Sequence, residues 1–195
     1  PLTSLERAPE PAPIDDFSVL DLGDPIVAIY VDVSMPVNTP TPNADERFDV
    51  ESVLVDLEAA TQSCAQIPEK RYLVDCLSDR LEAAAQALPD TGELGDAKAE
   101  IVDAARKLGA LAKANRSLDA SGMVRAPRVG NLAISRPLFA VNEAQLDAVT
   151  AEAFAIINEL ETRLLRSSEG TSNRSSDVQR IAQAVGSNKL LLRSF

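Results

Sequence analysis

The sequence predicts a mainly α-helical protein, a helical bundle of about four to five helices with a small β element from the N-terminal segment. Apolar residues recur every three or four positions through most of the chain after residue 48, as they do on one face of an α-helix. The apolar content comes mainly from Ala, Leu and Val, with no Trp, five Phe and two Tyr. Small aliphatic side chains suit closely packed helices better than a β-sandwich.

The first 48 residues divide into two parts with different patterns. Residues 1–16 hold four prolines and no apolar period, which predicts a flexible leader, with a PxxP ligand as the alternative. Residues 17–48 form a predicted β and loop arm, because apolar side chains alternate along Ile26–Met35 as in a half-buried strand. Such a strand needs partners, and the candidates are Leu132–Ser135 and the C-terminal tail Lys189–Phe195.

Residues 49–195 are the predicted helical bundle domain. Asp49 has the residue type and position of an N-cap for the first helix, whose apolar stripe covers 50–64. Pro68 fits the first turn of a second helix, because proline is tolerated at that position. The stripe of this second helix covers 73–88.

The third predicted helix covers about 93–118 and has a heptad-like seam. Its apolar positions alternate by three and four residues over nearly four repeats. We interpret it as a bundle helix that packs within the chain. An intermolecular coiled coil is the alternative, and it would make the protein a homo-oligomer.

The fourth predicted helix has the clearest start signal in the chain. Asn142 is the expected N-cap, Gln145 stands at the capping-box position, and the helix is expected to end near Arg166. A short fifth helix is expected from Ser176 to Gly186, where glycine ends the apolar period.

The long connection at 119–141 has no helical period and is our first choice for a binding surface. Connections of this length tend to be functional or disordered. Its three arginines, Arg125, Arg128 and Arg136, are the candidate contacts for a partner or an anion.

Cys64 and Cys76 are the only cysteines in the chain. In a protein outside the cytoplasm we favour a disulfide between them, worth roughly 3 kcal/mol by loop closure, and two buried free thiols are the alternative. A tight hairpin around Pro68 would place Cys76 opposite an earlier residue than Cys64. The disulfide therefore requires the first helix to end near Ser63 and residues 64–68 to be irregular.

Charge is distributed unevenly along the chain, whose net charge is −11. Residues 1–63 hold 13 acidic and 2 basic residues, whereas 64–195 hold 17 of each. Residues 104–142 alone hold seven basic residues and one acidic residue. The acidic total and the few aromatics argue against nucleic acid as a partner. We expect the acidic N-terminal arm to dock on this basic segment, either within the chain or between subunits. The expected partners of the protein as a whole are another protein or its own subunits.

The residue content argues against the common catalytic sites. Histidine is absent, which excludes Ser-His-Asp and Cys-His schemes and imidazole metal sites. Glycine-rich phosphate loops and the GxSxG motif are also absent. We therefore expect no enzyme activity, cofactor or metal. The longest apolar run, Ile26–Val31, is too short to span a membrane.

These patterns predict a non-enzymatic structural or protein-interaction module that is secreted or periplasmic. A start at Pro1 fits a mature terminus left by signal removal, or a cut made elsewhere in a longer chain. The alternative function is a small-molecule or lipid carrier with an apolar pocket between helices. An apolar cavity of a few hundred cubic ångströms in the bundle core would favour the carrier, and a solid core with an exposed apolar stripe would favour interaction.

Overall fold

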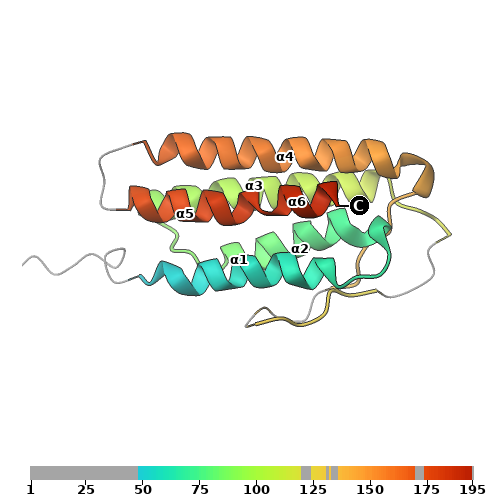
Figure 1. The fold of residues 1–195 in the computed structure, drawn as a ribbon, viewed down its shortest axis with the longest axis horizontal. Coiled ribbons are helices and arrows are strands. Elements are labelled where there is room, and N and C mark those ends of the chain that lie inside the picture. Colours follow the sequence, from blue (N-terminus) through green and yellow to red (C-terminus); the bar gives the residue numbers. More distant parts are fainter. Residues whose placement is uncertain (1–47, 120–123, 131, 133–135, 170–173, 195) are drawn as a thin grey trace, which may run out of the picture. The chain divides into compact units, whose positions relative to one another are not determined.

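The computed structural model describes residues 48–194, except for 120–123, 131, 133–135 and 170–173. The predicted helical bundle is confirmed, since five helices of twelve or more residues pack together (Figure 1). They are α1 Val50–Ala65, α2 Leu73–Ala85, α3 Gly92–Ala114, α4 Leu146–Ser167 and α5 Ser175–Gly186. A short sixth helix, α6 Asn188–Arg193, follows α5, and 3-10 turns at Lys70–Tyr72 and Glu143–Gln145 precede α2 and α4.

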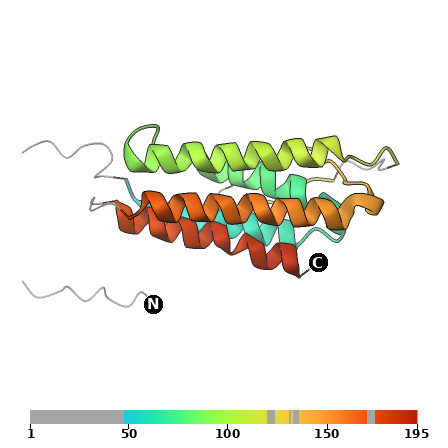
Figure 2. The ribbon, with the colours of Figure 1, turned by 90° about the horizontal axis from the view of Figure 1, so that it is seen from above.

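Consecutive long helices run antiparallel and pack on one another in chain order (Figures 1 and 2). The fifth helix, α5, also packs on α1, so the last long helix returns to the first and closes the bundle. The sixth helix, α6, continues roughly in the direction of α5 and lies against α4. The core between the helices consists almost entirely of Leu, Ile, Val and Ala side chains.

Helix α2 is buried on nearly every side, whereas the sequence predicts a single buried stripe. Ten of its 13 residues are buried. They include the polar Asp75, Ser78 and Arg80, because α1 and α3 cover two sides of the helix and the connection before α4 covers another. Buried charged groups need partners, and Asp75 and Arg80 both have them.

The second helix begins at Leu73, so the expected start near Pro68 is wrong. Residues 66–69 form an irregular turn, and the 3-10 turn Lys70–Tyr72 completes the reversal. The first helix extends to Ala65, two residues beyond the predicted end. The late start of α2 places its first turn, with Cys76, beside the last turn of α1.

The third helix ends at Ala114, four residues before its predicted end. The chain leaves the helix because Arg116 forms an antiparallel bridge with Val141, and the Ser117 N–H donates to the Ala140 carbonyl at 2.7 Å. Leu118, the last residue of the predicted seam, is 84% exposed. Asn115, the seam residue before it, is half-buried. The six earlier seam residues are buried within the chain, as the bundle interpretation expects: Leu94, Ala97, Ile101, Ala104, Leu108 and Leu111.

Two predicted helix caps are present. The Asp49 carboxylate accepts a hydrogen bond from the Glu51 N–H at 3.1 Å. The Asn142 side chain accepts one from the Ala144 N–H at 3.0 Å, in the 3-10 turn that opens α4. Each cap satisfies a backbone donor that has no partner inside the helix.

The C-terminal tail is helical, so it is not the partner strand that the sequence analysis proposed. Leu191 and Leu192 of α6 are buried, which explains why this apolar segment lies on the bundle. The predicted strand Ile26–Met35, the leader 1–16 and all but the last residue of the arm 17–48 lie outside the described residues. In the described parts of 119–141, the chain forms neither helix nor strand.

Candidate functional site

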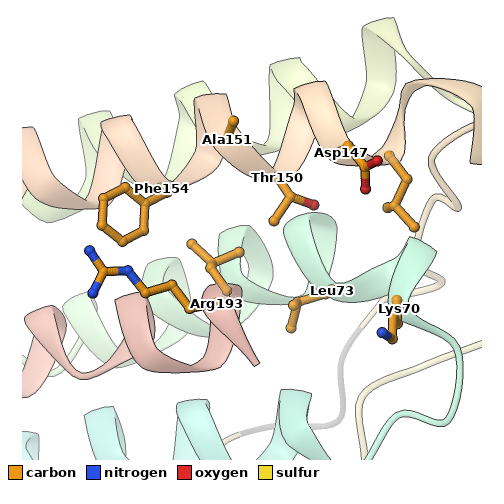
Figure 3. Close-up of a pocket in the computed structure, with 9 residues that line it drawn as sticks. Lys70, Leu73, Asp147, Thr150, Ala151, Phe154 and Arg193 are labelled. Carbon is orange, nitrogen blue, oxygen red and sulfur yellow. The ribbon is translucent and has the colours of Figure 1, made fainter. Parts of the chain in front are cut away.

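A cleft opens between α2, α4 and α6 (Figure 3). Its volume is about 370 Å³. The residues around it come from the turn before α2, the first half of α4 and the end of α6. They are Lys70, Leu73, Leu146, Asp147, Thr150, Ala151, Phe154, Leu192 and Arg193. We call this space the α2/α4/α6 cleft.

Helix α4 supplies one wall through a face beside its core stripe. Asp147, Thr150 and Phe154 are three and four residues apart, so they lie along the same side of the helix. The core stripe, which includes Val149 and Ala153, is turned toward the interior of the bundle. Phe154 is only partly buried, and its ring therefore borders both the core and the cleft.

The start of α2 supplies the opposite wall, and several bonds fix its position. Cys64 and Cys76 form a disulfide with their Cα atoms 5.7 Å apart, which joins the last turn of α1 to the first turn of α2. This confirms the predicted cysteine pair. The Arg71 carbonyl accepts a hydrogen bond from the Val141 N–H at 2.7 Å, so the 3-10 turn is also tied to the chain before α4. Lys70 belongs to this fixed turn, and Leu73 follows it as the first residue of α2.

Helix α6 forms the third side, and polar contacts on its first turn hold it in place. The Lys189 ammonium pairs with the Glu161 carboxylate of α4. The buried Asn188 side chain accepts a hydrogen bond from the Thr61 hydroxyl of α1 at 2.9 Å. With its first turn held on two helices, α6 carries Leu192 and Arg193 into the cleft.

The floor of the cleft is apolar and its rim is charged. Leu73 and Leu192 are buried, and the Phe154 ring lines the same space. The Arg193 guanidinium lies over that ring, 4.6 Å from the ring centre. Lys70 and Asp147 lie toward the other end of the cleft (Figure 3). The cleft thus offers an apolar surface with charged groups at both ends.

A second hollow of about 360 Å³ adjoins the cleft and is more polar. It shares Lys70 and Leu146 with the cleft and adds Glu69, Arg71 and Glu143. The Arg71 Nε donates to the Glu69 carboxylate at 2.7 Å, and this contact raises the pKa of the Arg71 guanidinium. Three carboxylates, those of Glu69, Glu143 and Asp147, thus line the two hollows near Lys70.

Behind the α2 wall lies a buried ionic contact that we call the Asp75–Arg136 lock. The Asp75 carboxylate accepts hydrogen bonds from Arg136 Nη1 at 2.6 Å and Nη2 at 2.8 Å, and from the Phe139 N–H at 2.7 Å. Asp75 is fully buried, whereas the Arg136 side chain is 42% exposed. Hydrogen bonding to Asp75 is the main reason that the pKa of Arg136 is raised. The lock fastens the connection before α4 to α2.

The structure separates the three arginines that the sequence analysis grouped. Arg136 is held in the lock, 61 positions away from Asp75 in the sequence. Arg125 and Arg128 are exposed on the connection. That segment is itself anchored, because the Pro127 carbonyl accepts a hydrogen bond from the Ser63 hydroxyl at 2.5 Å. A contact of these arginines with a partner stays a prediction.

Sequence reasoning missed the α2/α4/α6 cleft. Phe154 was the available signal, because it is an aromatic residue one position away from the apolar stripe of α4. The other wall residues come from segments more than 40 positions apart, and no local pattern joins them. The basic character of Lys70 and Arg193 also carried no signal, because isolated charges are common on helix surfaces.

Two further properties of the described residues bear on function. No group of three or more Cys, Asp or Glu side chains among them is arranged to hold a metal ion. None of the described helices combines the length and the apolar content that crossing a bilayer requires.

Comparison of the chain with protein-family models, with curated proteins and with solved structures finds no match.

Proposed function

We propose that the protein is a non-enzymatic binding protein that holds a small amphipathic ligand in the α2/α4/α6 cleft. The observation that carries this proposal is the cleft itself. Its volume of about 370 Å³ falls within the range of known small-molecule sites, roughly 300–1,000 Å³. Its apolar floor and few charged rim groups also match the usual composition of such sites.

The lining residues suit binding better than catalysis. Lys70, Asp147 and Arg193 are exposed, whereas enzymes usually hold their reacting groups in a site that excludes water. The whole chain also lacks histidine, the commonest general base. We assign the charged rim the role of orienting a ligand whose apolar part covers Leu73 and Leu192.

The size of the cleft sets the scale of ligand and affinity. A water molecule occupies about 30 Å³ in the liquid, so a space of about 370 Å³ holds on the order of 12 non-hydrogen atoms. At about 0.3 kcal/mol per atom, such a ligand gains about 4 kcal/mol, which corresponds to a Kd of about 1 mM. Better-matched ligands would bind more tightly, so the assay must cover micromolar to millimolar concentrations.

The direct test fills the cleft and measures ligand binding. Thr150→Trp places a large side chain from α4 into the space between Thr150 and Leu73. Thr162→Trp is the matched control, because Thr162 is equally half-buried on the same helix but does not line the cleft. We expect an apolar fluorescent probe to bind the wild type and Thr162→Trp, and to bind Thr150→Trp at least fivefold more weakly. Equal binding by all three folded proteins would refute the proposal.

A second candidate function is the protein-interaction module that the sequence favours. What supports it is that Arg125 and Arg128 are exposed on a connection tied to α1 through Ser63. An anchored basic surface suits an acidic protein partner or the acidic segment of another subunit. Self-association measured by light scattering at low and high salt tests the second option. The double variant Arg125→Gln/Arg128→Gln should abolish any salt-sensitive association.

We also propose that the protein works in an oxidising compartment, either secreted or periplasmic. The Cys64–Cys76 disulfide supports this, because such bonds persist mainly outside the cytoplasm. Mass spectrometry of the protein alkylated directly in its native cells would test the proposal. A mass showing two alkylated thiols would contradict it.

A further inference from the structure

We propose that the ligand of the α2/α4/α6 cleft is a single-chain carboxylate of about a dozen non-hydrogen atoms, similar to a medium-chain fatty acid. Its head would bind the Arg193 guanidinium, and its chain would lie over Leu192 and Leu73. This inference rests on the proposed function and adds the class of ligand and its orientation.

The position of Arg193 supports an anionic head. Its guanidinium lies 4.6 Å from the centre of the Phe154 ring, at one end of the apolar floor (Figure 3). In the part of the chain that the structure describes, no carboxylate lies within ion-pairing distance of it. Contact with a ring uses the charge of the guanidinium but none of its five N–H donors. These donors match the two oxygens of a carboxylate.

The anchoring of α6 makes Arg193 a fixed receptor. Lys189 and Asn188, one turn earlier, hold α6 on α4 and α1. Leu192 is buried beside Arg193. A carboxylate bound to Arg193 would therefore have the apolar side chain of the neighbouring Leu192 next to the start of its hydrocarbon chain.

The opposite end of the cleft disfavours an anion. Lys70 and Arg71 contribute two positive charges there, whereas Glu69, Glu143 and Asp147 contribute three negative ones. This difference in local charge directs a carboxylate to the Arg193 end and its chain along the floor. A cationic head would instead prefer the Asp147 end, which makes it the sharpest competing ligand.

The size of the cleft limits the length of the chain. A volume of about 370 Å³ holds on the order of 12 non-hydrogen atoms, which is the number in decanoate. Because the chain lies in an open groove, longer acids would leave their ends in water. We expect affinity to rise with chain length up to about ten carbons and then level off.

The test compares three ligands with the same chain and different heads. Decanoate, 1-decanol and decylammonium are titrated below micelle formation, with chemical shifts or heat as the readout. We expect decanoate to bind the wild type about tenfold more tightly than 1-decanol, since charge-assisted hydrogen bonds are the stronger class. Arg193→Gln should remove that preference and leave 1-decanol within twofold. Arg193→Lys should retain part of it.

A matched control and three outcomes decide the result. Arg166→Gln removes an exposed arginine from the far end of α4 and should leave all three affinities unchanged. Equal binding of decanoate and 1-decanol, or tightest binding of decylammonium, would overturn the carboxylate assignment while leaving the proposed cleft function intact. Binding that Thr150→Trp does not weaken would remove both. Circular dichroism of Arg193→Gln checks that α6 stays folded.

Discussion

Breaking the Asp75–Arg136 lock should destabilise the bundle strongly, although one partner reaches the surface. Arg136→Gln removes two hydrogen bonds of 2.6 and 2.8 Å and, among the residues that the structure describes, leaves the fully buried Asp75 carboxylate with the Phe139 N–H as its one donor. Removing one partner of a buried ion pair costs about 3–5 kcal/mol. Because Arg136 is 42% exposed, we expect the lower end, about 3 kcal/mol.

A double-mutant cycle separates the contact from other effects of the substitutions. Asp75→Asn removes the buried charge and should also cost about 3 kcal/mol, since Arg136 loses its closest carboxylate and keeps only the weaker contact with Asp79 at 3.7 Å. The double variant has neither charge, so we expect a total near 4 kcal/mol and not 6, a coupling of about 2 kcal/mol. Urea denaturation followed by circular dichroism gives these free energies. For a chain of this size, about 3 kcal/mol corresponds to a Tm lower by roughly 6–12 °C.

An exposed ion pair provides the control for this cycle. Arg163 contacts Glu159 at 2.5 Å and Glu100 at 3.1 Å; it is as exposed as Arg136, but its partner carboxylates are 54% and 39% exposed. Arg163→Gln is the same substitution in a solvated setting, and it should leave the unfolding midpoint almost unchanged. A cost for Arg136→Gln no larger than this, or additive effects of the two lock substitutions, would refute the argument that burial of Asp75 makes the contact important.

Three further predictions concern other parts of the bundle. Replacing both cysteines, Cys64→Ser/Cys76→Ser, should lower the free energy of unfolding by about 3 kcal/mol, the loop-closure estimate for a separation of 12 residues. Calorimetry of the wild type should likewise show a lower Tm when reductant is present. Burial raises the pKa of Asp56, so its charged form is less stable in the folded state, and this penalty grows as pH rises through that raised pKa. Asp56→Asn should therefore raise the Tm at pH 7 and give no gain below 3.8, the ordinary Asp value; a lower Tm at pH 7 would contradict this. Leu118→Ser should leave the Tm unchanged, because Leu118 is 84% exposed, and a clear loss would indicate that another surface covers it.

Most of the helical bundle could be predicted from local pattern. The seam of α3 and the stripe of α4 follow the three- and four-residue spacing that places side chains on one face, and most of their residues are buried as expected. Asp49 and Asn142 were identified as caps because their side chains satisfy nearby backbone donors, a strictly local effect. Where structure depends on neighbours in sequence, the sequence was informative.

The predictions that were wrong concern the start of α2, the end of α3 and the C-terminal tail, and their causes are ambiguous local patterns or non-local contacts. Pro68 is allowed in a first helical turn but does not require one, and α2 starts five residues later, after a 3-10 turn. The third helix stops at Ala114 because Arg116 forms an antiparallel bridge with Val141, 25 positions away, through hydrogen bonds made by the neighbours of both residues. The segment that forms α6 is too short for its apolar residues to distinguish a helix from a strand.

Asp75 shows most clearly why the candidate site could not be predicted. An acidic residue in a helix pattern indicates a solvated face, yet Asp75 is fully buried because Arg136 reaches it from the connection before α4. The cleft in front of α2 likewise uses residues from three distant segments. Its existence depends on how the helices are placed, and periodicity within one helix carries no information about that.

The placement of the α2 wall depends on contacts outside the apolar core, and this has a consequence for function. A disulfide holds Cys76 to α1, a hydrogen bond holds the Arg71 carbonyl to Val141, and the lock holds Asp75 to the same connection. All three lie within three positions of Leu73, whereas the far half of α2 combines apolar packing with the Arg80–Asp79 ion pair. Binding sites need their walls held more rigidly than folding alone requires. The concentration of covalent and ionic fixing points at the end of α2 that borders the cleft is therefore a second reason, independent of cleft volume, to place the function of the protein there.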